Sequence, residues 1–182
     1  SDVYKRQLNN WVKSVLIGKH IRRNGAVLDL ACGKGGDMLK FKAGGCALYV
    51  GIDIAIASVR DALTRYNDTS RGAMPFAATL MVGDFCKDSL AAALPAGQYF
   101  DLVSCQFALH YSFVSEERAR AFLRNVSARL RQGGVFVGTT TDANVLVRRL
   151  REAPALEFGN VHYNVRFGAA HAAKKFLSLI HI

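Results

Sequence analysis

Residues 26–37 read Ala-Val-Leu-Asp-Leu-Ala-Cys-Gly-Lys-Gly-Gly-Asp, a short apolar run followed by a glycine-rich turn. An apolar run of this length that stops at glycines is typical of a buried strand with a tight connection to a helix. Glycines there let the backbone turn sharply and let a ligand approach closely. The stretch therefore predicts a first strand over residues 26–30 and a ligand-binding loop after it.

The same kind of apolar run recurs along the chain. We predict further strands at residues 48–52, 78–82, 100–104 and 135–139. Helical spacing of apolar residues separates these runs, and such alternation indicates right-handed crossovers and a parallel sheet. The predicted fold is therefore α/β: a Rossmann-like, mostly parallel sheet with helices on both faces.

Three stretches have the apolar spacing of helices: residues 9–23, 58–66 and 115–131. The third begins at Ser115, a suitable N-cap, and is expected to end at Gln132-Gly133-Gly134. The first is expected to pack across the sheet or to lie over the ligand pocket. The expected buried faces are Trp11, Val12, Val15 and Leu16 in the first helix, Val59, Ala62, Leu63 and Tyr66 in the second, and Ala119, Phe122, Leu123, Val126 and Leu130 in the third.

The composition is that of a globular protein rather than a disordered one, with 51% hydrophobic and 21% charged residues among 182. No apolar run approaches the roughly 18–20 residues that span a bilayer, so we expect a soluble, intracellular protein with no membrane partner. The four cysteines are scattered, which favours free thiols over disulfides or a metal site. The net charge of +10 favours an anionic partner such as nucleic acid, although a basic surface can also serve solubility.

Both ends of the chain look like translated adapter sequence. These ends are residues 1–7 and 177–182, and we exclude them from the fold prediction. The predicted domain, a partial one, covers residues 8–176. On this interpretation the natural protein is longer and continues beyond the C-terminal end.

Two carboxylates extend the prediction of a ligand site. Asp53 ends the second predicted strand, twenty positions after Gly33, where it can accept hydrogen bonds from ribose hydroxyls. Asp84 ends the third predicted strand, where it can accept a hydrogen bond from an adenine amino group. Together with Asp29 and the G-x-G-G spacing, these two carboxylates suit S-adenosylmethionine better than a dinucleotide. The pyrophosphate of a dinucleotide prefers an open helix N-terminus. Taken singly, Asp53 could instead cap a helix and Asp84 could be a turn residue.

The motifs resemble those of the mRNA cap guanine-N7 methyltransferase family, class I enzymes that use S-adenosylmethionine. The resemblance runs from about Asn9 to Phe167, and its most specific elements are the Gly-Lys-Gly-Gly-Asp loop at 33–37 and Gln-Phe-Ala-Leu-His-Tyr at 106–111. It implies that the cofactor is held by Lys13, Asp29, Ala31, Gly33, Asp53, Asp84, Gln106 and Tyr111. It implies that the RNA cap is contacted by Asn9, Asn10, Lys34, Lys40, Arg65 and His110.

The chemistry agrees in part with these implied roles. Lys34, Lys40 and Arg65 are cations suited to a triphosphate bridge, although a solvated basic face would look the same. One departure from the family is Ala31, where some members have glycine; a methyl group there requires a negative φ. Another is that the family's C-terminal half adds cap contacts, so this chain could bind the cofactor without full activity.

Guanine N7 has a lone pair and no proton, so we predict no acid–base catalyst; His110 and Tyr111 are expected to orient ligands. The resemblance also implies a monomeric catalytic domain in the nucleus, capped mRNA as substrate, and possible association with capping or transcription factors. Two other functions stay open. One is methylation of a small molecule by a class I enzyme, and the other is a catalytically weak RNA-binding subunit.

Overall fold

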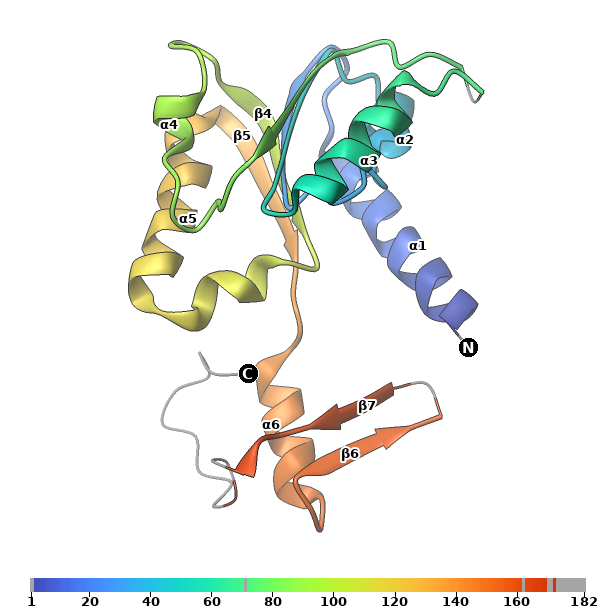
Figure 1. The fold of residues 1–182 in the computed structure, drawn as a ribbon, viewed down its shortest axis with the longest axis vertical. Helices are drawn as coiled ribbons and strands as arrows, with labels where there is room; N and C mark the ends of the chain where they lie inside the picture. The colour runs from blue at the N-terminus through green and yellow to red at the C-terminus, as the bar shows by residue number, and fades with distance from the viewer. Residues whose placement is uncertain (1, 71, 162, 170–171, 173–182) are drawn as a thin grey trace. The chain divides into compact units, whose positions relative to one another are not determined.

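The computed structural model describes residues 2–70, 72–161, 163–169 and 172 (Figure 1). The chain forms two compact units. The larger unit runs from Val12 to Thr140, and the other contains the residues up to Trp11 together with those from Thr141 onward. The predicted boundaries at residues 8 and 176 stay predictions.

A five-stranded parallel sheet forms the centre of the Val12–Thr140 unit, in the order β3-β2-β1-β4-β5. The strands are β1 Ala26–Leu30, β2 Leu48–Asp53, β3 Ala77–Val82, β4 Phe100–Gln106 and β5 Leu130–Thr139. All five predicted strands are confirmed, and β5 begins earlier than expected. The strand order reverses between β1 and β4, and open α/β sheets bind ligands beside the carboxyl ends of strands at such a point.

Helices cover both faces of this sheet, as predicted (Figure 1). The helices are α1 Asp2–His20, α2 Met38–Ala43, α3 Ile56–Asn67, α4 Leu90–Ala93, the 3₁₀ helix η1 Leu109–Val114, and α5 Glu116–Arg129. On one face Ile17 of α1, Phe41 of α2 and Ala62 of α3 belong to one buried apolar cluster. On the other face Leu90 of α4 and Phe122 of α5 belong to a second. The fold class is therefore confirmed.

The predicted helices form, but parts of their predicted buried faces are wrong. Leu63 is 51% exposed, Leu123 55% and Trp11 64%, whereas Ile17, which was not expected to be buried, is completely so. Helical spacing defines an apolar stripe about 100° wide, but the sheet covers only the part of it that the crossing position of the helix allows. The edge of each stripe therefore depends on tertiary packing.

The predicted helix extends to Arg131, whereas α5 ends at Arg129. The residues at its end make contacts outside the helix. The buried Arg129 guanidinium donates to the backbone carbonyls of Ala91, Leu94, Pro95 and Gln98, which surround the end of α4. Leu130 already pairs with Phe100 of β4. The hydrogen bonds from this charged group to several carbonyls hold the chain here, so the helix ends before the Gln132-Gly133-Gly134 stretch that the sequence suggested.

The other unit contains α6, Ala143–Glu152, and an antiparallel hairpin of β6 Glu157–Asn160 and β7 Tyr163–Arg166. Asp142 caps α6 by accepting from the Val145 N–H at 3.1 Å. Glu157 accepts from Arg166 and Asn164, and these bonds lower the pKa of its carboxyl. Of the two ends predicted to be foreign, residues 2–7 form the start of α1, and residues 177–182 lie outside the described part.

None of the described helices has both the length and the apolar character needed to cross a membrane. The four cysteines, Cys32, Cys46, Cys86 and Cys105, are free and buried. Burial raises the pKa of each thiol above its ordinary value. Because a thiol that keeps its proton is a poor nucleophile, these side chains act as small packing groups.

Candidate active site

Asp53 ties the end of β2 to the glycine loop that follows β1. Its Oδ2 accepts from the Gly33 N–H at 2.8 Å, and its Oδ1 accepts from the Ala55 N–H at 2.9 Å. Gly33 has φ +54°, a left-handed conformation that glycine adopts readily. The carboxylate therefore holds the loop in place and also begins the turn into α3.

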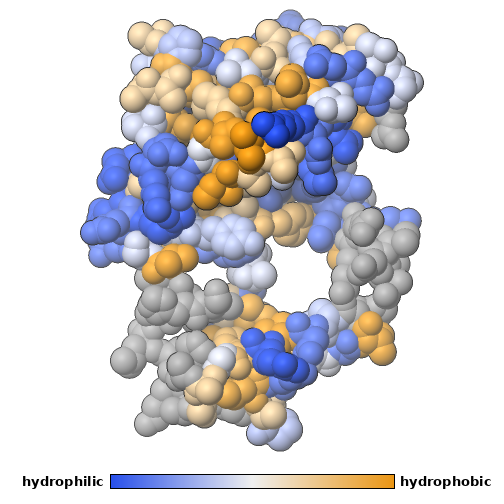
Figure 2. Space-filling view, viewed as in Figure 1, coloured by the Kyte–Doolittle hydropathy of each residue, from blue (hydrophilic) through white to orange (hydrophobic). Residues whose placement is uncertain are grey.

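Asp53 and Asp84 line one shared cavity of about 390 Å³ at the carboxyl ends of the strands. Ala31, which follows β1, lines the same cavity, and so do the exposed side chains of Ile54 and Tyr111. Figure 2 shows hydrophobic side chains gathered on one face of the Val12–Thr140 unit with hydrophilic ones around them. The structure thus brings together the two carboxylates that the sequence placed at neighbouring strand ends.

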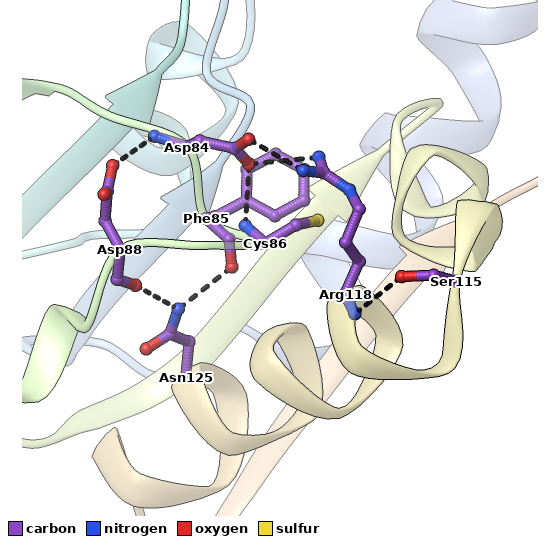
Figure 3. Close-up of polar contacts among 7 residues, drawn as sticks. All are labelled: Asp84, Phe85, Cys86, Asp88, Ser115, Arg118 and Asn125. Carbon is purple, nitrogen blue, oxygen red and sulfur yellow. Dashed lines mark hydrogen bonds and ion pairs between the residues drawn. The ribbon is translucent and has the colours of Figure 1, made fainter.

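Arg118, which the sequence gave no reason to select, binds Asp84 inside this cavity (Figure 3). Its Nη1 donates to Asp84 Oδ2 at 3.1 Å and its Nη2 to Asp84 Oδ1 at 3.3 Å. The Cys86 N–H donates to the same Oδ1 at 2.9 Å. Arg118 belongs to no recognisable motif, and arginines are frequent along the exposed faces of helices. Only the fold brings this arginine to Asp84, which follows β3.

Asp29 lies beneath the glycine loop, in a cluster apart from the shared carboxylates. It is 2% exposed, and the buried Tyr49 hydroxyl donates to its Oδ2 at 3.0 Å. Burial, with help from the nearby Asp37 carboxylate, raises the pKa of Asp29 to about 8. The buried Asp29 carboxyl therefore gives up its proton much less readily than an exposed aspartate does.

Gln106 lies at the end of β4, where it bridges to β5. Its amide nitrogen donates to Ser104 Oγ at 3.1 Å, and its oxygen accepts from Thr139 Oγ1 at 3.2 Å. His110 and Tyr111 follow in η1, with their ring centroids 4.4 Å apart. His110 Nδ1 is buried and has no hydrogen-bond partner among the described residues.

Lys13 and Lys40 converge on one carboxylate. Each ammonium lies 2.8 Å from Asp37 Oδ1, and both side chains are mostly buried. The family resemblance gives Lys13 to the cofactor and Lys40 to the cap, yet the structure places them side by side at the start of α2. Lys40 is thus less accessible than a residue at a pocket mouth would be.

Lys34 and Arg65 line a second cavity of about 500 Å³ beside α3. Lys34 forms an exposed ion pair with Asp61 at 2.8 Å, and Arg65 Nε donates to the Lys34 carbonyl at 2.8 Å. Lys34 directly follows Gly33 and so is connected through one peptide to the Asp53 contact. Asn9 and Asn10 belong to the other unit, and their assignment to the cap rests on the resemblance alone.

The expectation that Ala31 has a negative φ is wrong, because its φ is +62°. A non-glycine residue in this left-handed region costs roughly 1–2 kcal/mol. The loop imposes it: the next residue, Cys32, donates its N–H to Ile52 of β2 at 3.0 Å and accepts from the Gly35 N–H at 3.0 Å. Ala31 is therefore a strained position at the wall of the shared cavity.

Replacing Ala31 with glycine is expected to stabilise the chain by about 1 kcal/mol, because glycine adopts this φ without strain. Urea denaturation measures the change. Ala128→Gly, at an exposed position in the last turn of α5, is the matched control and should destabilise by up to about 1 kcal/mol. The same sign at both positions would contradict the assignment of strain to Ala31.

The residues around the shared cavity fit the adenosine part of S-adenosylmethionine. A carboxylate offers about four acceptor positions, and backbone N–H groups occupy one on each oxygen of Asp53. Two positions remain for ribose hydroxyls. Apolar groups such as Ile54 and Phe85 line the cavity beside these few polar atoms, and its volume lies within the ordinary range for small-ligand sites.

Comparison with known proteins gives the family. A profile of the mRNA (guanine-N(7))-methyltransferase domain matches residues 1–179. The chain belongs to this family. It is 50% identical over 181 residues to mRNA cap guanine-N(7) methyltransferase 1 of Arabidopsis thaliana, covering 97% of this chain and 49% of that protein. It is 42% identical over 169 residues to the Schizosaccharomyces pombe enzyme, covering 89% and 46%. The chain thus spans about half the length of the curated relatives it matches.

Solved structures agree on the methyltransferase fold. A protein from Pyrococcus horikoshii aligns with a TM-score of 0.63 at 23% identity, covering 95% of this chain and 80% of that one. An S-adenosylmethionine-dependent methyltransferase from Mesorhizobium loti aligns with a TM-score of 0.60 at 25% identity, covering 86% and 62%. As a member of the guanine-N7 methyltransferase family, the chain has S-adenosylmethionine as its cofactor.

Proposed function

We propose that the protein transfers a methyl group from S-adenosylmethionine to N7 of the guanosine cap of mRNA. The observation that carries the proposal is the single cavity shared by Asp53, Asp84 and Ala31 at the strand ends. The proposed substrate is inferred from family membership, because relatives that are 50% and 42% identical to this chain are named mRNA cap guanine-N(7) methyltransferases. The net charge of +10 suits an anionic RNA.

The adenosine part of the cofactor would lie at the carboxyl ends of β1, β2 and β3. Asp53 would accept the ribose hydroxyls, and Asp84 would accept the adenine amino group. Lys13, now paired with Asp37, would bind the cofactor carboxylate. The remaining contacts proposed from the resemblance are Ala31, Gly33, Gln106 and Tyr111, together with Asp29, which is buried and does not line the cavity.

The cap would be held by cations and polar groups near the loop. Lys34 and Arg65 line one cavity and are suited to the triphosphate, and Lys40 would join them if its contact with Asp37 opened. His110, whose buried Nδ1 has no partner among the described residues, would contact the cap as the family resemblance implies. Asn9 and Asn10 complete the proposed cap contacts.

The bound cofactor supplies an electrophilic methyl group on a sulfonium. Guanine N7 carries a lone pair and no proton, so none of these side chains has to remove one. Catalysis then depends on the positions that His110, Tyr111 and the strand-end residues impose on the two ligands. The rate of the chemical step is expected to show no single steep ionisation, which a pH profile of single-turnover methylation would reveal.

A methylation assay tests the proposal directly. The chain is incubated with labelled S-adenosylmethionine and RNA that begins with GpppG, and the cap is released by nuclease digestion. We expect label in 7-methylguanosine, and none in uncapped RNA of the same sequence. Label transferred instead to members of a small-molecule panel would identify a different class I methyltransferase. Cofactor binding without any transfer, both in this chain and in a version extended to the length of its relatives, would favour a catalytically weak subunit.

From the family resemblance, we propose that the protein acts in the nucleus, as a monomeric catalytic domain that can associate with capping or transcription factors. Its family membership supports this location. Fluorescent tagging in cells tests it, and an exclusively cytoplasmic signal would contradict it.

A further inference from the structure

Arg118 and Asp84 form a paired group in the wall of the shared cavity. Both guanidinium nitrogens reach the carboxylate, one to each oxygen, at 3.1 and 3.3 Å. The side chains are 25% and 16% exposed, so the pair is mostly shielded from water. Two parallel charge-assisted bonds fix the orientation of a carboxylate far better than one bond does.

The backbone of Arg118 is itself fixed at the start of α5. Ser115 is the N-cap, and its Oγ accepts from the Arg118 N–H at 3.3 Å (Figure 3). Arg118 is therefore the third residue of the helix, where a capping bond holds the first turn. Its guanidinium extends from a rigid point toward the loop after β3.

Two further residues on the same face of α5 hold that loop. Phe122, one turn after Arg118, packs its ring edge-on against Phe85, with centroids 5.6 Å apart. Asn125, two turns after Arg118, donates to the carbonyls of Phe85 at 2.9 Å and Asp88 at 2.8 Å (Figure 3). The loop that carries Asp84 is thus bound to α5 both through its backbone and through its functional side chain.

Although it is paired with Arg118, the Asp84 carboxylate can still accept a hydrogen bond from a ligand in the cavity. Oδ1 accepts from both Cys86 and Arg118, whereas Oδ2 accepts from Arg118 alone among the described residues. A carboxylate oxygen has about two acceptor positions, so Oδ2 retains one. The guanidinium also balances the charge of Asp84, which limits its repulsion of Asp53 across the same cavity.

We propose that Arg118 is a positioning residue for base recognition: it holds Asp84 so that Oδ2 accepts from the amino group of the cofactor's adenine. Arg118 acts through Asp84 and not on the methyl group. The inference rests on the proposed function. It assigns to α5 the task of distinguishing adenine from bases that lack an amino group at the same position.

Two ligands that differ only in the base test this role. S-adenosylhomocysteine carries the amino group, and its analogue with unsubstituted purine in place of adenine carries a hydrogen at that position and has no donor for Asp84. Calorimetry on the full chain gives the ratio of the two dissociation constants. We expect the unmodified chain to prefer S-adenosylhomocysteine strongly, and Arg118→Gln to reduce that preference about tenfold.

A general loss of structure in Arg118→Gln would weaken the binding of both ligands alike. An unchanged ratio of dissociation constants in this variant would overturn the inference. Arg118→Lys guards against a misfolded glutamine variant, because it keeps the charge and stem but cannot bind both oxygens; we expect an intermediate ratio. Arg120→Gln is the matched control, since Arg120 pairs with exposed Glu116 on the same helix, and it should keep the original ratio.

A double-mutant cycle with Asp84→Asn separates action through Asp84 from independent action. Once Asp84 is changed, Arg118→Gln should alter the ratio less than twofold. Additive effects would overturn the proposal. If the unmodified chain bound no S-adenosylhomocysteine, the proposed function would fail and this inference with it. If it bound the ligand and Arg118→Gln kept the ratio, only the role of Arg118 would fail.

Discussion

Replacing Asp53 with alanine is expected to lower the affinity for S-adenosylhomocysteine by at least about 100-fold, effectively abolishing cofactor binding. The proposed ribose contacts disappear, and hydrogen bonds to a charged group contribute about 1.5–3 kcal/mol each. The substitution also removes the acceptors of the Gly33 and Ala55 N–H groups, which lie at 2.8 and 2.9 Å. Calorimetry with the product-like ligand measures the loss, and circular dichroism verifies the fold.

Two variants make this result specific. Asp53→Asn keeps the shape of the side chain but not its charge, so an intermediate loss is expected. Lys34→Ala alters the residue next to Gly33 and removes only an exposed pair with Asp61. It should leave cofactor affinity within about threefold, the range of a surface ion pair, and weaken binding of capped RNA. Cofactor loss in Lys34→Ala together with cap loss in Asp53→Ala would refute both assignments.

Replacing Asp29 with asparagine is expected to stabilise the ligand-free chain by several kcal/mol at pH 8 and by almost nothing at pH 3. Burial raises the pKa of Asp29 from 3.8 to about 8 in the folded state. Between these values the folded chain binds a proton that the unfolded chain has lost, so the free energy of unfolding falls as pH rises. One pKa unit corresponds to about 1.4 kcal/mol, which gives a total of roughly 5 kcal/mol.

The stability that the protonated acid contributes is therefore fully present below about pH 4 and is lost as pH rises through about 8. Asparagine does not titrate, so its variant lacks this part of the pH dependence. Urea denaturation at intervals from pH 3 to 9 measures the difference between the two chains. A difference that stays constant over this range would contradict the raised pKa.

Tyr49→Phe provides an independent control on the same cluster. The Tyr49 hydroxyl bond to Asp29 lowers the pKa of the acid, and burial outweighs it. Removing the hydroxyl should raise the pKa further and move the loss of stability to higher pH. A shift to lower pH would show that the hydroxyl does not favour the charged form.

Local patterns were sufficient for the strands and for the two carboxylates. A parallel strand buried on both faces reads as an apolar run, which is why residues 26–30 and 100–104 were recognisable. Asp53 and Asp84 were found because each follows such a run, and parallel strands bring their carboxyl ends to one edge of the sheet. Their shared cavity follows from topology that the alternation of strands and helices already implied.

Long-range contacts were not recoverable in this way. Arg118 lies 34 positions after Asp84, and nothing in the spacing of α5 separates it from the exposed Arg120. The Tyr49 hydroxyl bond to Asp29 depends on the register of β1 with β2. The sign of φ at Ala31 was expected wrongly, because alanine normally avoids the left-handed region and only the surrounding loop enforces it.

By itself the sequence determined the α/β class, the position of the glycine loop and the acids at the strand ends. These features repeat with the period of one element or mark its end, so neighbouring residues encode them. Only the tertiary structure decided which helix faces are covered, that Arg118 holds Asp84, and that burial raises the pKa of Asp29. Those outcomes depend on which distant side chains meet and on how much water they exclude, and both are set by packing of the whole sheet and its helices.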